Sequence, residues 1–255
     1  MKFCAYIQNK MLSLVIPAHN EEGCIEKTIK IFNKRLKEEK IKHEILVVND
    51  HSNDKTEEIL KKLEKEIKEL RHINNDSQRG FGTTVIKGLR NFKGNYVAIV
   101  MADLSDMPKD LVKYYNEIIK GYDAVFGSRF IKGGKVIDYP SHKLLLNRLG
   151  NIMIKFIFGI KYNDVTNAFK MYKKETIIGL EPIISKQFNL TVELPLKAII
   201  RGYSYKVVPN IWVNRKTGVA KFKIREMGSR YFFIIFYCLL EKWLSKGDYR
   251  KGNKM

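Results

Sequence analysis

The chain has 255 residues, enough for one α/β domain with a full core, and its 45% apolar and 11% aromatic content excludes wholesale disorder. Its 47 basic and 27 acidic residues give a net charge of +20, which favours an anionic partner such as nucleic acid, anionic lipid or a phosphorylated substrate. The cysteines have no metal-type spacing, and no run reaches the roughly 20 apolar residues that cross a bilayer, so we expect a cytoplasmic protein.

The first half of the chain alternates short apolar runs with amphipathic segments. Buried strands are predicted at 11–16, 44–48, 96–101 and 123–127. Helices are predicted at 22–39, from an Asp54 cap through Leu70, at 82–92 and at 108–119. This alternation predicts the α/β class, with a doubly wound, largely parallel sheet.

The second half changes character. An apolar helix with scattered polar residues is predicted at 144–158, and a polar turn entering a strand at 163–172. A helix at 190–201 and one or two strands within 203–213 follow. We expect one domain over 11–215, and over 216–255 a basic loop with a C-terminal apolar or amphipathic helix.

Polar residues follow the predicted strands, where an open parallel sheet binds its ligands. Asp50 ends the second strand and can accept hydrogen bonds from a base or a ribose, or form an ordinary Asx turn. Asp103 follows the third strand and can hold the divalent cation of a nucleotide diphosphate, or cap the helix near Pro108.

Five segments in order resemble family 2 glycosyltransferases of the GT-A fold, in the group of the dolichol-phosphate mannosyltransferases. They are VIPAHNEE (15–22), VVNDHSND (47–54), MADLSDMP (101–108), GSRFIKGG (127–134) and NRKTGVAKF (214–222). NDVTNAFKMY (163–172) occupies the place of an acceptor-loop segment. The resemblance covers about residues 11 to 225.

The resemblance implies a role for each matching residue. Donor-binding positions fall on Pro17, His19, Glu21, Val48, Asp50, Ala102, Asp103, Arg129, Arg215 and Lys221. The implied ligands of Mg2+ or Mn2+ are Asp103 and Ser105, and the implied catalytic set is Asp103, Arg129 and Asp164. Two positions depart from the family pattern, because Met101 and Asn49 stand where aspartate is usual, and we expect weaker metal dependence.

The implied acceptor is a polyprenyl phosphate, reached by inverting transfer. A phosphate monoester is already mostly a dianion at neutral pH, so it needs charge compensation and orientation but no base. A basic track precedes or enters the apolar 144–158 helix and could hold such a head group, or simply be solvated: Arg129, Lys132, Lys135, Lys143 and Arg148. The alternative acceptor, a sugar hydroxyl of a growing glycan, would need a base such as Asp164 or Asp106.

The C-terminal segment offers two interpretations. The run from Tyr231 to Leu240 is apolar all round, so it is buried in protein or in lipid. Its basic flanks and Trp243 favour a helix lying at the cytoplasmic face of a membrane, and a buried core helix is the rival. A nucleic-acid-binding protein is a third functional class, but the chain carries no nucleic-acid motif and we expect no such partner.

Overall fold

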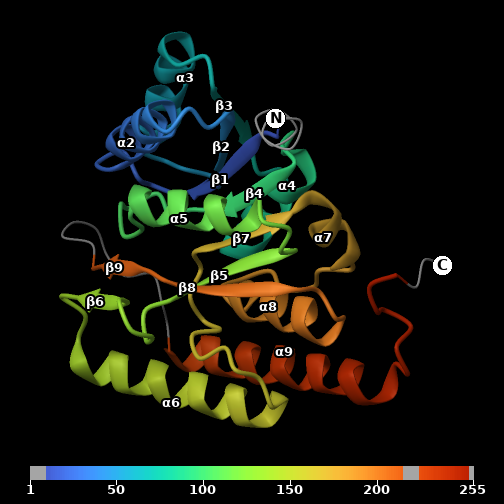
Figure 1. Ribbon diagram of the computed structural model, residues 1–255. Helices are drawn as coiled ribbons and strands as arrows, with labels where there is room; N and C mark the ends of the chain where they lie inside the picture. The colour runs from blue at the N-terminus through green and yellow to red at the C-terminus, as the bar shows by residue number, and fades with distance from the viewer. Residues whose placement is uncertain (1–9, 215–223, 253–255) are drawn as a thin grey trace, which may run out of the picture.

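The computed structural model describes residues 10–214 and 224–252 (Figure 1). Its strands are β1 (Leu12–Ala18), β2 (His43–Asn49), β3 (Leu70–Asn74), β4 (Tyr96–Ile99), β5 (Ala124–Ser128), β6 (Lys135–Ile137), β7 (Lys170–Lys173), β8 (Tyr205–Pro209) and β9 (Ile211–Val213). Its helices are α2 (Ile25–Glu38), α3 (Thr56–Glu66), α4 (Phe81–Asn91), α5 (Pro108–Ile118), α6 (Ser141–Phe158), α7 (Lys174–Gly179), α8 (Leu190–Ile200) and α9 (Ile224–Leu244).

Seven strands form one sheet in the order β3-β2-β1-β4-β7-β5-β8, and β6 pairs with β9 in a small second sheet. Neighbouring strands of the large sheet are parallel except at β7, which runs antiparallel to both β4 and β5. The α/β class and the largely parallel sheet predicted from the sequence are confirmed. Ala18 pairs with Asn49 at the ends of β1 and β2, so the loops after these strands lie side by side.

Apolar layers cover both faces of the sheet because successive side chains of a strand point to opposite faces. In β1, Leu14 and Ile16 pack with α2, α3 and α5, whereas Val15 packs on the opposite face with α4 and α8. Figure 1 shows α6 and α9 together along the β8 end of the molecule. Lys242 on α9 donates to the carbonyl of Phe158 at the end of α6 at 2.9 Å.

One helix prediction is corrected. The helix expected to run from Asp54 through Leu70 ends at Glu66, and Leu70 instead begins the edge strand β3. Asp54 does accept the Thr56 amide at 3.0 Å, although the helix cap itself is Lys55. The segment 203–213 forms two strands, β8 and β9, and β6 and α7 were not predicted.

Helix α9 combines both properties considered for the C-terminal segment. Ile234, Ile235 and Cys238 are buried in the same apolar cluster as α8. Phe233 and Phe236 point outward and are about 60% exposed. One face of the helix therefore belongs to the core and another is an open apolar surface. Within the described residues, no helix is both long and apolar enough to cross a bilayer.

Candidate active site

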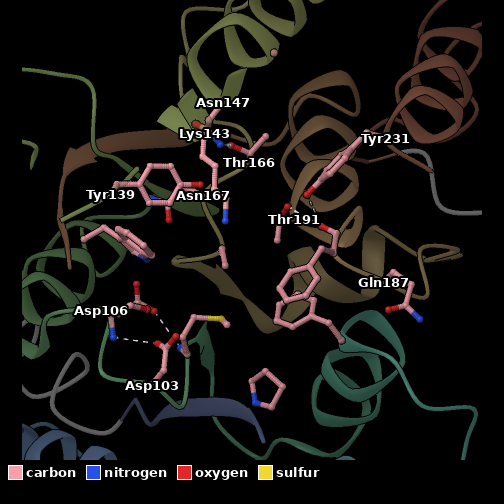
Figure 2. Close-up of a pocket in the computed structure, with 18 of the residues that line it drawn as sticks. Asp103, Asp106, Tyr139, Lys143, Asn147, Thr166, Asn167, Gln187, Thr191 and Tyr231 are labelled. Atoms are coloured by element: carbon pink, nitrogen blue, oxygen red, sulfur yellow. Dashed lines mark hydrogen bonds between the residues drawn. The ribbon is translucent and has the colours of Figure 1, made fainter. Parts of the chain in front are cut away.

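A cavity of about 740 Å³ opens at the carboxyl ends of the strands (Figure 2). Its inner wall comes from the loops after β1, β2, β4 and β5, which contribute His19, Asp50, Asp103 and Arg129 among others. Its outer wall comes from α6 and α9. The carboxyl ends of the strands, which were predicted to bind ligands, thus line a cavity. This cavity continues to the apolar helices α6 and α9.

The loops after β1 and β2 are joined by hydrogen bonds at the inner end of the cavity. The Nδ1 atom of His19 lies 2.6 Å from the carbonyl oxygen of Asp50. The Asp50 carboxylate accepts the side-chain amide of Asn75 at 2.9 Å and the backbone amide of Gly80 at 3.1 Å. Asp50 therefore orders the loop before α4 as well as lining the cavity, beyond the simple Asx turn considered from the sequence.

Several predicted donor-site residues line this end, but two do not. Pro17, His19, Glu21 and Asp50 line the cavity. The side chain of Val48 is fully buried in the core beside α4. Ala102 is also buried, in the opposite apolar layer, and its carbonyl accepts Thr28 Oγ1 at 2.6 Å. The structure thus places both side chains in the core and not in the cavity.

The loop after β4 brings oxygen atoms to the cavity, as Figure 2 shows for Asp103 and Asp106. Asp103 Oδ1 accepts the Ser105 amide at 3.1 Å, and Asp106 Oδ2 accepts the Met101 amide at 3.0 Å. Burial raises the pKa of Asp106 to about 7, and the negative charge of Asp103 adds to the increase. Helix α5 begins at Pro108 without a side-chain cap, so capping by Asp103 is not observed.

The donor set of this loop fits a hard divalent cation in part. Carboxylate and hydroxyl oxygens are the ligands that Mg2+ and Mn2+ favour, and the mutual repulsion of Asp103 and Asp106 would be relieved by a cation. Within the described ranges, no three His, Cys, Asp or Glu side chains form a metal-binding group. A bound ion would complete its coordination with oxygens from water or from a substrate diphosphate.

Arg129 and Asp164 meet in a buried ion pair beside the acidic loop. Arg129 Nε lies 2.9 Å from Asp164 Oδ2, and Nη2 lies 2.7 Å from Oδ1. Asp164 also accepts the Arg129 backbone amide at 2.8 Å, and its side chain is fully buried. Since both of its oxygens are occupied by Arg129, Asp164 holds the arginine at the cavity wall; it is not presented to an incoming hydroxyl group.

A polar network ties helix α6 to this pair. Asn147 Oδ1 lies 3.4 Å from Arg129 Nη2, and Asn147 Nδ2 donates to Thr166 Oγ1 at 2.9 Å. Asn151, one turn further along α6, donates to Thr166 Oγ1 at 2.8 Å and accepts the Thr166 amide at 3.2 Å. These hydrogen bonds give a structural role to the two asparagines of an otherwise apolar helix.

The basic track predicted from the sequence is only partly assembled. Lys143 and Arg129 both line the cavity, and Figure 2 shows Lys143 there. Arg148 instead packs over the ring of Phe130, 4.4 Å from its centroid. Lys132 and Lys135 are exposed and do not line the cavity.

Two aromatic pairs in the cavity wall were missed by sequence reasoning. Phe81 and Phe188 stack with centroids 4.3 Å apart, and Tyr139 meets Trp212 edge-on at 5.0 Å. The loop before α8 reaches Phe81 because Gly82 lets it approach: a Cβ there would lie 2.2 Å from the Ser185 carbonyl oxygen. The only local signal was the Gly80-Phe81-Gly82 sequence.

The predicted basic pair Arg215 and Lys221 lies outside the described residues. Asn214, which immediately precedes that segment, lines the cavity. Strand β9 brings the chain there beside the acidic loop, since the Val213 amide donates to the Ser105 carbonyl oxygen at 3.1 Å.

Helices α6 and α9, which form the outer wall of the cavity, both carry exposed apolar side chains. Leu146, Met153 and Phe232 line the cavity and are also exposed at the surface. Further exposed residues of the two helices are Leu145, Leu149, Ile152, Phe156, Ile157, Phe233, Phe236, Leu240, Trp243 and Leu244. We call this set, with Leu146, Met153 and Phe232, the two-helix apolar face.

Comparison with known proteins agrees with these features. The family model described as Glycosyl transferase family 2 matches residues 13–179. A polyprenol monophosphomannose synthase of Mycolicibacterium smegmatis is 30% identical over 204 residues, which is 73% of this chain and 76% of that protein. A dolichol-phosphate mannosyltransferase of Pyrococcus furiosus is 30% identical over 219 residues; the match includes 83% of this chain but 59% of the relative.

Solved structures show the same fold at lower sequence identity. Glucosyl-3-phosphoglycerate synthase of Mycobacterium tuberculosis, crystallised with Mn2+, UDP and glucosyl-3-phosphoglycerate, superposes with a TM-score of 0.68 and 16% identity. The superposition covers 94% of this chain and 82% of that one. The same enzyme crystallised with Mg2+ and UDP superposes with a TM-score of 0.67 and 15% identity.

Proposed function

The chain belongs to glycosyl transferase family 2, and we propose that it moves a sugar from a nucleotide-diphosphate donor to a polyprenyl phosphate by one inverting displacement. It is a glycosyltransferase of the GT-A fold. The observation that carries the proposal is that one and the same cavity is lined by the acidic loop at the strand ends and by Leu146, Met153 and Phe232 of the two-helix apolar face. Such a cavity suits a donor with a charged diphosphate and an acceptor with a lipid chain.

At the inner end, Pro17, His19, Glu21 and Asp50 are proposed to hold the donor nucleotide. Asp103, with Ser105, would hold a divalent cation, which supplies positive charge to the departing diphosphate. The Mn2+ and Mg2+ complexes of the fold relative are consistent with this, and Met101 leaves fewer carboxylates than the family pattern. Arg215 and Lys221 are proposed to contact the same diphosphate.

The acceptor phosphate is proposed to bind beside Arg129 and Lys143. Its oxygen attacks the anomeric carbon as the bond to the donor diphosphate breaks, which inverts the configuration. No proton has to be removed from a phosphate dianion. This suits a site in which Asp164 is fully buried and already occupied by Arg129. The alternative, a sugar hydroxyl as acceptor, would require a base and is less well supported.

We propose that the protein docks peripherally on the cytoplasmic face of a membrane through the two-helix apolar face. Burial of apolar side chains and attraction of a +20 chain to anionic lipid would both contribute. The lipid acceptor would then enter the cavity directly from the bilayer, between α6 and α9. Neither helix needs to span the membrane for this.

The proposal is tested by a screen of donors and acceptors. Purified protein with Mg2+ or Mn2+ is mixed with GDP-mannose, UDP-glucose or UDP-N-acetylglucosamine and with a polyprenyl phosphate, and the glycolipid product is measured. We expect one donor to give a sugar phosphate diester of inverted configuration. Transfer only to a free oligosaccharide, with none to any polyprenyl phosphate, would overturn the proposal in favour of the hydroxyl acceptor.

A further inference from the structure

Two glycines lie inside the helices that form the outer wall of the cavity. Gly150 is in α6 and Gly228 is in α9, and both line the cavity. Glycine destabilises a helix interior relative to alanine, because it loses more backbone freedom on folding. An isolated glycine inside a helix is tolerated, but it costs stability relative to alanine.

Among the described residues, neither a positive φ nor a close contact requires glycine at these two positions. Neither residue is among the glycines with positive φ, so an alanine could adopt both conformations. A Cβ built on either one would meet no atom within 4 Å in the described part of the chain, its own helix backbone aside. Gly82 differs, because a Cβ there would lie 2.2 Å from a backbone oxygen.

The positions of the two glycines point to the outlet of the cavity. Gly150 lies one turn after Leu146 and one turn before Met153 on α6, and Gly228 lies one turn before Phe232 on α9. Leu146, Met153 and Phe232 line the cavity while remaining exposed, so they mark where it opens on the two-helix apolar face. A side chain at Gly150 or Gly228 would project into the same passage.

We propose that Gly150 and Gly228 set the width of this outlet, so that a methyl-branched isoprenoid chain can pass between α6 and α9. The inference rests on the proposed function, because the occupant is the chain of the acceptor phosphate. The branches of an isoprenoid make it wider than a straight alkyl chain. Leucine at either position would narrow the passage more than alanine would.

The test compares Gly150→Leu and Gly228→Leu with Gly150→Ala and Gly228→Ala as matched controls. The acceptors are undecaprenyl phosphate and the straight-chain dodecyl phosphate, with the donor selected by the screen above. We expect each leucine to raise the KM for undecaprenyl phosphate about tenfold, since displacing even two carbons from apolar contact corresponds to that factor. The KM for dodecyl phosphate should change much less, and each alanine variant should raise the KM for undecaprenyl phosphate less than the leucine variant at the same position.

Unchanged KM for undecaprenyl phosphate in both leucine variants would overturn the inference, and so would equal losses on the two acceptors. Transfer by the wild-type protein decides the proposed function separately: if it uses neither phosphate, the function is wrong and the inference falls with it. Nucleotide binding by calorimetry and a thermal melt check that each variant is folded. Should leucine prevent folding, methionine at the same position provides an unbranched replacement.

Discussion

Arg129 and Asp164 form a bidentate ion pair at the wall of the cavity, with Nε–Oδ2 and Nη2–Oδ1 distances of 2.9 Å and 2.7 Å. Burial alone would lower the pKa of Arg129, but the adjacent Asp164 carboxylate outweighs it and raises this pKa above its usual value. The two residues act as one unit: the carboxylate fixes the plane of the guanidinium, and the guanidinium presents the charge.

Replacing Asp164 with Asn should lower both stability and activity. A buried cation without its partner costs about 3–5 kcal/mol of unfolding free energy, and a displaced Arg129 should reduce kcat/KM by more than about tenfold. Chemical denaturation and steady-state kinetics measure the two effects. If Asp164 acts through Arg129, adding Asp164→Asn to Arg129→Met should cause little further loss of activity. A large additional loss would show an independent role for Asp164.

Replacing Asp103 with Ala should remove metal-dependent turnover while leaving the fold intact. Asp103 lines the cavity and is proposed as the main ligand, so we expect a decrease in kcat of about 100-fold or more, comparable with the loss of a principal electrostatic contact. Binding of Mn2+, followed by electron paramagnetic resonance with nucleotide present, should weaken in parallel. Asp76→Ala, at an exposed site away from the cavity, serves as the control. Normal activity in Asp103→Ala would exclude the assignment.

Neutralising Arg215 or Lys221 should slow transfer more than it affects stability. A charge-assisted contact to the leaving diphosphate is worth about 1.5–3 kcal/mol, so each alanine variant should lose at least about tenfold in kcat/KM. Lys216→Ala provides a control within the same segment. Equal behaviour of all three variants would show that general positive charge, and not these two residues, matters.

Replacing outward-facing phenylalanines should reduce membrane binding without unfolding the protein. Phe156 on α6 and Phe236 on α9 are 78% and 60% exposed, so Glu at either position should weaken sedimentation with anionic liposomes. Ile178→Glu on α7, which is 64% exposed and outside the two-helix apolar face, is the matched control. Binding should decrease, but not vanish, at high salt, because only the electrostatic contribution is screened. Wild-type binding by both glutamate variants would exclude this face.

Deleting residues 228–255 tests the proposed boundary between a domain over 11–215 and a separate C-terminal segment. The deletion removes Ile234 and Cys238 from the core, together with Glu241, whose Oε1 lies 2.7 Å from Arg201 Nε. We therefore expect loss of the folded state in a thermal melt. A truncated protein that melts like wild type would show instead that α9 is dispensable to the fold.

Protonation of the Asp123 carboxylate should account for part of the loss of folding stability at low pH. Burial alone would raise its pKa, but hydrogen bonds from Lys251, Ser204 and Lys173 outweigh this and lower the pKa to about 2. The unfolded chain titrates near 4, so the stabilisation is present above that pH and is lost as pH falls toward 2. We expect about 1–2 kcal/mol of unfolding free energy from this group, less than the full shift implies, because solvent screens its pairing with the half-exposed Lys251. Lys251→Met should diminish the loss of unfolding free energy between pH 4 and 2, measured by chemical denaturation. The same pH dependence in the variant and the wild type would contradict this role of Lys251.

Much of the inner site could be predicted from the sequence. Buried strands carry their signal locally, in short apolar runs, and the polar residues after them must meet where parallel strands end. Asp50 and Asp103 were found in this way, and the ordered motifs identified the family. Strand β3 was missed because Leu-Arg-His-Ile-Asn lies at the sheet edge and has no apolar run to mark it.

The sequence by itself determined the α/β class, the family and the strand-end residues, because each apolar run and each motif consists of residues that are neighbours in the chain. Tertiary structure decided how Arg129 and Asp164 pair, how Phe81 meets Phe188, and which face of α9 is buried. These contacts join segments far apart in the chain, and each depends on how helices and loops pack around the sheet. An all-apolar run such as 231–240 cannot show which of its sides will meet the core, because that is fixed only when α8 packs against it.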